Sequence, residues 1–343
     1  MQHEITEAKP LLDAKGNLTE AGYAKKLLPI YHRADVKANK ARLKEWDYYL
    51  IANDKIAVAL TIADNGYMGL DSVSFLNFED RPWEQTVSKM RAMPMGKTCL
   101  PESSVTGDCA VAGKGYRMTF AHDKRERKLF FHMDKFKGGD AIDGKITLSA
   151  APEESMVICT PFLKPKHFYF NQKINCMRAS GTVKLGDWEY HFDPENSFAV
   201  LDWGRGVWTY HNTWYWGSAS GQVSGVPFGF NIGYGFGDTS AASENMLFYD
   251  GKAHKLSEVT FRIPMNNGKD EFMKPWTFTS DDGRFEMDFV PIIDRAANMD
   301  FKLLKSDQHQ VFGRFTGKAV LDDGTVIEVK DFLGFAEKVE NKW

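Results

Sequence analysis

The sequence has few cysteines and no long apolar run. Its four cysteines form no C-x-x-C pair, which argues against a thiolate zinc site or a disulfide framework. No apolar run reaches the ~18 residues that a membrane-spanning helix needs. The first residues, MQHEITEAKPLLDAKG, are charged and lack the apolar core of a signal peptide. We therefore expect a cytoplasmic protein with reduced thiols and no transmembrane segment.

The sequence also has no large excess of positive or negative charge. Lys and Arg together number 43 and Asp and Glu 46, which gives a net charge of -3 with both signs interspersed. Nucleic-acid binding needs a basic surface, so we expect no nucleic-acid partner. The nine histidines contain no H-E-x-x-H pair, and GYGFGD lacks the helix that must follow a dinucleotide-binding loop. We expect neither a metal nor a cofactor.

The pattern after residue 46 is that of a β protein. Short β-branched and aromatic runs alternate with Gly, Asp and Asn, which predicts antiparallel strands. Asp-Gly pairs in FTSDDGRFEMDFV and KAVLDDGTVIEVKDF predict two hairpins, because a tight turn needs a residue with positive φ. The total strand length is too great for one small barrel. We predict a mainly β fold of two successive antiparallel barrels.

Helix signals are confined to the front of the chain. LTEAGYAKKLL and ADVKANKARLKEW predict one or two short helices before Trp46. We expect residues 1–46 to form a helical segment that packs on the barrels. The first barrel is expected over residues 47–151, with C-terminal strands as a source of additional pairing, and the second over 152–343. The boundary rests on the charge and proline in LSAAPEESM.

Four of the nine tryptophans lie in one segment, DWGRGVWTYHNTWYWGSASG, which begins at Asp202. If residues 207–221 form one strand, alternate side chains share a face. That face carries Trp208, Tyr210, Asn212, Trp214, Trp216 and Ser218. Buried indole N–H groups and amides need hydrogen-bond partners, so the face suits a ligand cavity. Core packing between sheets is the alternative.

The following segment, VPFGFNIGYGFGD, has one bulky face and one nearly bare face. Large residues from Phe228 to Tyr234 alternate with glycines and with Asn231. Glycine weakens a strand, so this pattern predicts a strongly coiled barrel strand or the close approach of a ligand or neighbouring backbone. We assign Asn231 and Tyr234 to the binding site.

Motifs along nearly the whole chain resemble an uncharacterised bacterial family. They include FYFNQKIN, ASGTVKLGD, FGFNIGYGFGD, ENMLFYDGKAHKLSEVTF and DGTVIEVKDFLGFAEKVENKW. That family is distantly similar to the carotenoid 1,2-hydratase and tocopherol cyclase group, which implies two lipocalin-like barrels. Carotenoid hydratases carry an Asp-His-Asn-Trp-Gly motif. Here HNTWYWG keeps His211, Asn212 and Gly217, with Trp214 or Trp216, but Tyr210 stands in place of the Asp.

The resemblance implies a cofactor-independent hydratase, cyclase or isomerase that protonates a C=C bond of an isoprenoid or lipid-like molecule. The donor must be an acid that burial keeps neutral near pH 7. Asp202 is the first candidate, with Glu244 and Asp238 as reserves, and His211 is a candidate base. An ion pair between Asp202 and Arg205 would instead make Asp202 structural.

We favour an enzyme and keep two other functions open. A hydrophobic-ligand carrier would need the tryptophans and no acid. A carbohydrate-binding or glycoside-cleaving protein would use Asp202 and Glu244 as a carboxylate pair. The expected partner is a hydrophobic small molecule, a peripheral membrane contact is left open, and the oligomeric state is undetermined. The predicted substrate-binding residues are Arg205, Trp208, Tyr210, Asn212, Trp214, Trp216, Asn231 and Tyr234.

Overall fold

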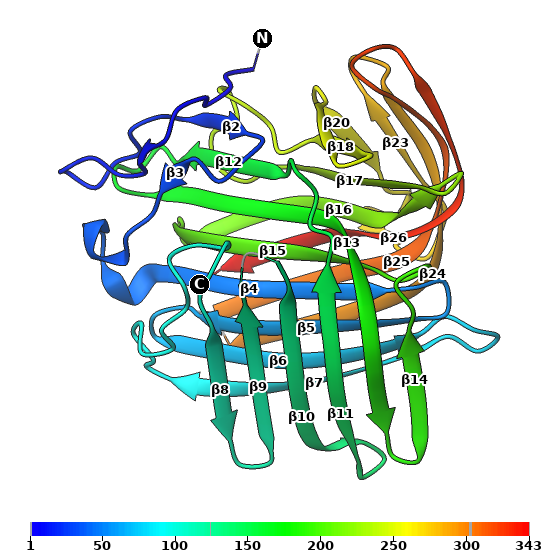
Figure 1. Ribbon diagram of the computed structural model, residues 1–343. Helices are drawn as coiled ribbons and strands as arrows, with labels where there is room; N and C mark the ends of the chain where they lie inside the picture. Colours follow the sequence, from blue (N-terminus) through cyan, green and yellow to red (C-terminus); the bar gives the residue numbers. More distant parts are fainter. Residues whose placement is uncertain (1, 124, 302–303, 343) are drawn as a thin grey trace.

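The computed structural model describes residues 2–123, 125–301 and 304–342. Its two large antiparallel sheets are curled into half-barrels, which confirms the predicted mainly β fold of two successive barrels (Figure 1). The first sheet takes the blue to green part of the chain and the second the green to red part. A helix long and apolar enough to cross a membrane does not occur among the described residues.

The first sheet has thirteen strands within the described residues, ordered β7-β6-β5-β4-β15-β13-β11-β10-β9-β8, with β12, β14 and β2 paired beside this path. Its strands are β2 (Gly22–Ala24), β4 (Leu43–Ala52), β5 (Ile56–Asp64), β6 (Met68–Asn77), β7 (Trp83–Ala92), β8 (Cys109–Gly113), β9 (Tyr116–His122), β10 (Arg127–Lys137), β11 (Asp140–Ser149), β12 (Met156–Pro161), β13 (Phe168–Leu185), β14 (Trp188–Phe192) and β15 (Phe198–Val207).

The second sheet has nine strands in the described chain, ordered β19-β18-β17-β16-β26-β25-β24-β23-β20. Its strands are β16 (His211–Val223), β17 (Val226–Tyr234), β18 (Met246–Tyr249), β19 (Lys252–Lys255), β20 (Val259–Arg262), β23 (Trp276–Ser280), β24 (Phe285–Phe301), β25 (Leu304–Val320) and β26 (Val326–Lys342). Two small sheets pair β1 (Lys9–Pro10) with β3 (Pro29–Ile30) and β21 (Met265–Asn266) with β22 (Lys269–Asp270).

Both predicted Asp-Gly hairpins are present. Strand β23 pairs with β24, and β25 pairs with β26. The turn glycines Gly283 and Gly324 have φ of 68° and 86°, the left-handed region that favours glycine.

The N-terminal helices are largely absent. In the described chain, helix is limited to two 3-10 turns, η1 (Arg33–Asp35) and η2 (Lys40–Arg42). The helix predicted over LTEAGYAKKLL is wrong, because that segment contains strand β2, which pairs with β12. Tyr23 and Ala24 are buried in this pairing. Tertiary pairing here overrides local helix propensity.

The chain passes from the first sheet to the second between Val207 and His211. The single strand expected over 207–221 is therefore interrupted at residues 208–210. Strands β12 to β15 all pair within the first sheet. The domain boundary at residue 152 stays a prediction.

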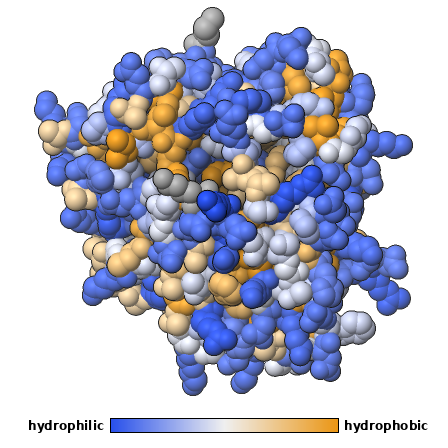
Figure 2. Space-filling model, in the orientation of Figure 1, coloured by the Kyte–Doolittle hydropathy of each residue, from blue (hydrophilic) through white to orange (hydrophobic). Residues whose placement is uncertain are grey.

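Each sheet encloses its own apolar core and presents its other face to the other sheet. Along β4, Tyr49 and Ile51 belong to the core of the first barrel, whereas Tyr48 and Leu50 pack with Phe312 of the second sheet. This alternation is the ordinary consequence of strand geometry. The face of the molecule in Figure 2 is mostly hydrophilic, with apolar side chains in separate patches. The contact between the sheets contains the candidate site.

Candidate functional site

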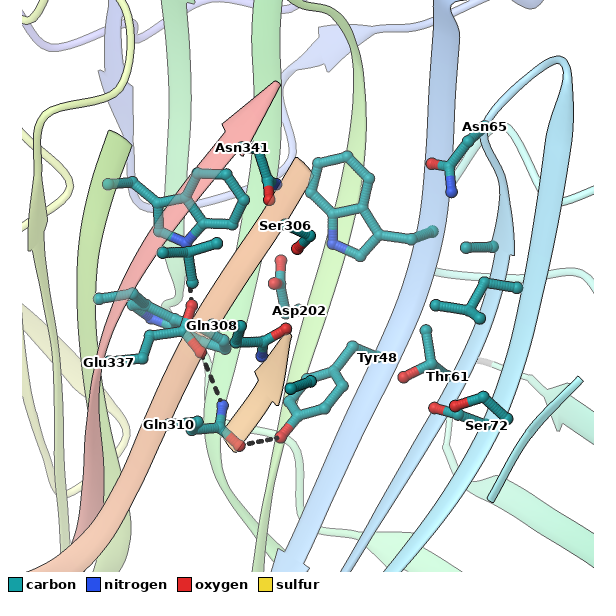
Figure 3. Close-up of a pocket in the computed structure, with 18 of the residues that line it drawn as sticks. Tyr48, Thr61, Asn65, Ser72, Asp202, Ser306, Gln308, Gln310, Glu337 and Asn341 are labelled. Atoms are coloured by element: carbon teal, nitrogen blue, oxygen red, sulfur yellow. Dashed lines mark hydrogen bonds between the residues drawn. The ribbon is translucent and has the colours of Figure 1, made fainter. Parts of the chain in front are cut away.

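A cavity of about 560 Å³ lies between the two sheets. One wall comes from β4 to β7 with β13 and β15, and the facing wall from β16 and β24 to β26 (Figure 3). Its volume falls in the usual range for small-molecule sites. The cavity lies outside both barrel cores.

A row of polar side chains crosses the wall of the first sheet. The residues Lys173, Asp202, Tyr48, Thr61 and Ser72 occupy successive paired positions on β13, β15, β4, β5 and β6. Directly paired residues of antiparallel strands point to the same face of the sheet, so all five face the cavity.

A second row crosses the wall of the second sheet. Trp216 pairs with Glu337, Glu337 with Gln310, and Gln310 with Arg295. All four line the cavity. The two rows meet where the Tyr48 hydroxyl lies 3.5 Å from Gln310 Oε1 (Figure 3).

Glu337 is the most unusual carboxyl of the cavity. Its side chain is buried, and burial raises its pKa from the ordinary 4.5 to about 7. The Trp214 indole N–H donates to its Oε1 at 2.9 Å, and Gln310 Nε2 donates to Oε2 at 2.9 Å. These donors and the positive charges of Arg295 and Lys173 oppose the rise without cancelling it. A carboxyl with a pKa near 7 can both give and take a proton at neutral pH.

Asp202 has a different environment. It lines the cavity, and its Oδ1 lies 3.1 Å from Lys173 Nζ and accepts a hydrogen bond from Asn171. Both members of the ion pair are buried. The partner is therefore Lys173 and not Arg205, the pairing that the sequence had suggested.

Glu244 is a second carboxyl near the same ammonium. Its Oε2 is 4.0 Å from Lys173 Nζ. Burial raises the pKa of Glu244, the nearby Asp202 raises it further, and Lys173 opposes both. Lys173 Nζ also lies 3.9 Å from the centre of the Trp216 ring, a cation-π geometry.

The bare face of β17 makes room for Glu244. A Cβ atom on Gly233 would lie 2.7 Å from Glu244 Oε1 and 2.8 Å from the Tyr215 carbonyl oxygen. Asn231, on the same face, accepts the Trp216 indole N–H at 2.7 Å and donates to the Glu244 carbonyl at 2.8 Å. The glycine pattern predicted a coiled strand or the close approach of a ligand or neighbouring backbone; at Gly233 the neighbours are the Tyr215 carbonyl oxygen and, in addition, this carboxyl.

Aromatic rings cover one end of the cavity. Trp46, Trp208 and Trp214 line it together with Phe236. Trp208 is 5.3 Å from Trp46, 5.9 Å from Trp214 and 4.8 Å from Phe236, measured between ring centres, and all three contacts are edge-to-face. The predicted tryptophans Trp208, Trp214 and Trp216 thus pack on neighbouring rings and also border an open volume.

Other predicted residues lie outside the cavity, among them Asn231, which is buried but does not line it. Arg205 projects from the opposite face of β15 into the first barrel, where its guanidinium bonds Asp47 at 3.1 Å. Tyr234 stacks on Tyr215 at 4.4 Å beside the core of the second barrel. Both positions follow from strand alternation, because neighbouring residues point to opposite faces.

The remaining four belong to loops or strand ends. His211 and Tyr210 are exposed where the chain changes sheets. Asn212 is buried but bonds Thr209, to which it donates at 2.7 Å. Asp238 is exposed, and hydrogen bonds from the Ser240 hydroxyl and from its N–H lower the pKa of the Asp238 carboxyl. None of these four lines the described cavity.

Sequence reasoning missed Glu337, Lys173 and Arg295. Glu337 stands between Phe335 and Val339, two buried residues on the same face of β26. A charged residue within such an apolar stripe was the available signal. Among the described residues, no three His, Cys, Asp or Glu side chains gather as a metal site would require.

The sequence profile of a family described as a domain of unknown function, DUF2804, matches residues 2–343. The chain belongs to this family. A comparison with curated protein sequences gave no match. The more specific likeness to carotenoid hydratase or tocopherol cyclase stays a prediction.

Two solved structures are similar to this DUF2804 chain. A Nitrosomonas europaea protein, provisionally assigned as AttH, has 12% identity and a TM-score of 0.56, with 96% of this chain and 98% of that one covered. Kievitone hydratase from Nectria haematococca has 11% identity and a TM-score of 0.46, with 98% of both chains covered. The first likeness supports the fold alone.

Proposed function

We propose that the cavity between the sheets binds a hydrophobic small molecule and transfers a proton to it without a cofactor, as a hydratase, cyclase or isomerase does. The observation that carries this proposal is Glu337, a buried carboxyl with a pKa of about 7 in a wall shared with tryptophans. Its pKa is matched to acid–base catalysis at neutral pH.

The proposed reaction begins with Glu337. The protonated carboxyl gives its proton to one carbon of a C=C bond, so a C–H bond forms and the neighbouring carbon becomes cationic. Glu337 is left as a carboxylate. In a hydration, water then forms a C–O bond to the cation, and its proton returns to a carboxylate. In an isomerisation, the Glu337 carboxylate instead takes a proton from a neighbouring carbon, and the C=C bond forms again in a new position.

Asp202 takes a different role from the one the sequence suggested. Its carboxyl lies 3.1 Å from the Lys173 ammonium, and in this pair Asp202 accepts a proton from water or stabilises a cation, while Glu337 replaces it as the acid. The indoles of Trp208, Trp214 and Trp216 supply electron-rich faces, each worth ~2 kcal/mol to a desolvated cation.

The test is to identify the bound molecule and then to follow its turnover. Native mass spectrometry of the protein purified from its host would identify a retained ligand. With that ligand, E337Q is expected to lower kcat by about 10²- to 10⁴-fold. The matched control is E328Q, an exposed glutamate on the same strand, which should leave kcat unchanged. Full activity of E337Q would exclude Glu337 as the acid.

The second candidate is a carrier for the same class of ligand. The aromatic end of the cavity favours it, since those rings need no acid to bind an apolar molecule. A ligand retained at one per chain and returned unchanged after prolonged incubation would favour the carrier. A glycosidase pair is less well supported, because Asp202 and Glu244 both lie within 4.0 Å of the Lys173 ammonium and so are engaged by the same cation.

A further inference from the structure

Arg295 is a cation in the cavity wall that the proposed chemistry does not use. It lies on β24, in the row that continues through Gln310 and Glu337 to Trp216. Its side chain is half-buried and lines the cavity. Neighbouring strands are ~4.8 Å apart, so its backbone lies ~10 Å from that of Glu337.

The guanidinium has few partners in the protein. Its Nη1 donates to Ser74 Oγ at 2.8 Å, across the gap between the sheets. Among the residues that the structure describes, no carboxylate oxygen lies within 4.0 Å of it. A guanidinium has five N–H donors in a planar fork, so most of its donor capacity is left for another group.

The other charged groups of the cavity are already matched. Lys173 has Asp202 at 3.1 Å and Glu244 at 4.0 Å. Glu337 accepts from Trp214 and Gln310, and Gln310 stands between it and Arg295 in the row. Removing a charge from water without a partner is costly, so a half-buried Arg295 favours an anion beside it.

We infer that Arg295 binds the carboxylate head group of an amphipathic acid, whose apolar body lies along the row past Glu337 against Trp216 and Trp214. This inference rests on the proposed function and names the class of ligand that the cavity takes. A carboxylate fits because the planar fork of arginine binds it in a bidentate manner. A single guanidinium, with Lys173 already engaged, matches one negative charge better than the two of a phosphate.

The test compares two ligands that differ only in the head group. Decanoate and decan-1-ol are titrated into the protein at pH 6.5, below their aggregation concentrations, with binding followed by calorimetry and by the fluorescence of the cavity tryptophans. Wild-type protein should bind decanoate about 10- to 100-fold more tightly than decanol. R295Q should bind decanol unchanged and lose the preference for decanoate.

The matched control is R81Q, which removes one positive charge from an exposed arginine in the loop before β7 and should keep the preference. Circular dichroism shows whether R295Q keeps its fold. Equal binding of acid and alcohol to wild type, or a preference that survives in R295Q, overturns the head-group inference and leaves the apolar cavity in place. Binding of neither ligand to wild type overturns both this inference and the proposed function.

Discussion

The Trp214 indole donates a hydrogen bond of 2.9 Å to Glu337 Oε1, which joins the aromatic end of the cavity to its most perturbed carboxyl. The two residues are separated by more than a hundred positions and lie on the paired strands β16 and β26. The bond opposes the effect of burial, because an N–H donor stabilises the charged form of a carboxyl. It therefore tunes the group that we propose as the acid.

Replacing Trp214 by phenylalanine should raise the pKa of Glu337 above its value of about 7. The ring remains but the N–H donor is lost, and one hydrogen bond to a charged group corresponds to roughly one pKa unit. A titration by ¹³C NMR of glutamate-labelled protein would measure the shift. W216F is the control, since that indole donates to Asn231 and not to Glu337. An unchanged or lowered pKa in W214F would contradict the assignment.

The contribution of Glu337 to the stability of the folded protein should fall as the pH rises from about 4.5 to about 7. The folded state raises the pKa of Glu337, so it holds the proton more tightly than the unfolded chain does. The contribution is fully present below pH 4.5 and is lost as the pH passes through 7, with a total of about 3 kcal/mol. Urea unfolding of wild type and E337Q at pH 4.5 and 7.5 isolates the contribution of Glu337 to the free energy of unfolding. Parallel pH dependences in the two proteins would refute it.

Replacing Lys173 by methionine should cost about 3–5 kcal/mol, because it leaves the Asp202 charge buried without its partner. Much of the loss should be recovered in K173M/D202N, where no charge is left unpaired. The exposed pair Lys318–Glu286, 2.8 Å apart, provides the comparison, because solvent screening leaves an exposed ion pair with little net effect on stability. Denaturant unfolding of the single and double variants of each pair measures the two coupling free energies. Equal coupling in the two pairs would contradict the buried network.

Substituting Gly233 with alanine should destabilise the protein by about 1–3 kcal/mol. The new Cβ would lie 2.7 Å from Glu244 Oε1 and 2.8 Å from the Tyr215 carbonyl oxygen, a backbone atom with little freedom to move. G217A is a milder comparison, because its nearest neighbour is Cγ1 of Ile232 at 3.0 Å and the nearest backbone atom, the Phe335 carbonyl oxygen, is 3.3 Å away. Thermal unfolding would rank the two. A G233A protein as stable as wild type would show that the strand yields easily.

Much of the fold follows from local patterns in the chain. Alternation along β17 and the Asp-Gly turns before β24 and β26 are properties of a few consecutive residues, and they predicted strands and hairpins that the structure contains. The helix expected over LTEAGYAKKLL failed because β2 pairs with a strand more than a hundred residues away. Local propensity is a weak guide where distant pairing buries a segment.

The candidate site could be predicted only in part. The tryptophans after Asp202 were visible as a cluster, and Trp208, Trp214, Trp216, Asp202 and Glu244 all line the cavity. Arg205 was placed there through its closeness in sequence to Asp202. Arg205 is three positions from Asp202, an odd number, so its side chain lies on the other face of β15 and inside the first barrel.

By itself, the sequence determined which side chains share a face of a strand, because that alternation depends only on backbone geometry. It therefore specified a β protein with an indole-rich strand. Only the tertiary structure decided that β26 lies between β16 and β25, and that the resulting wall faces β4 and β15. Strand pairing over such sequence distances is set by the packing of the whole chain. For that reason only the folded structure identifies Glu337 and Arg295 as site residues.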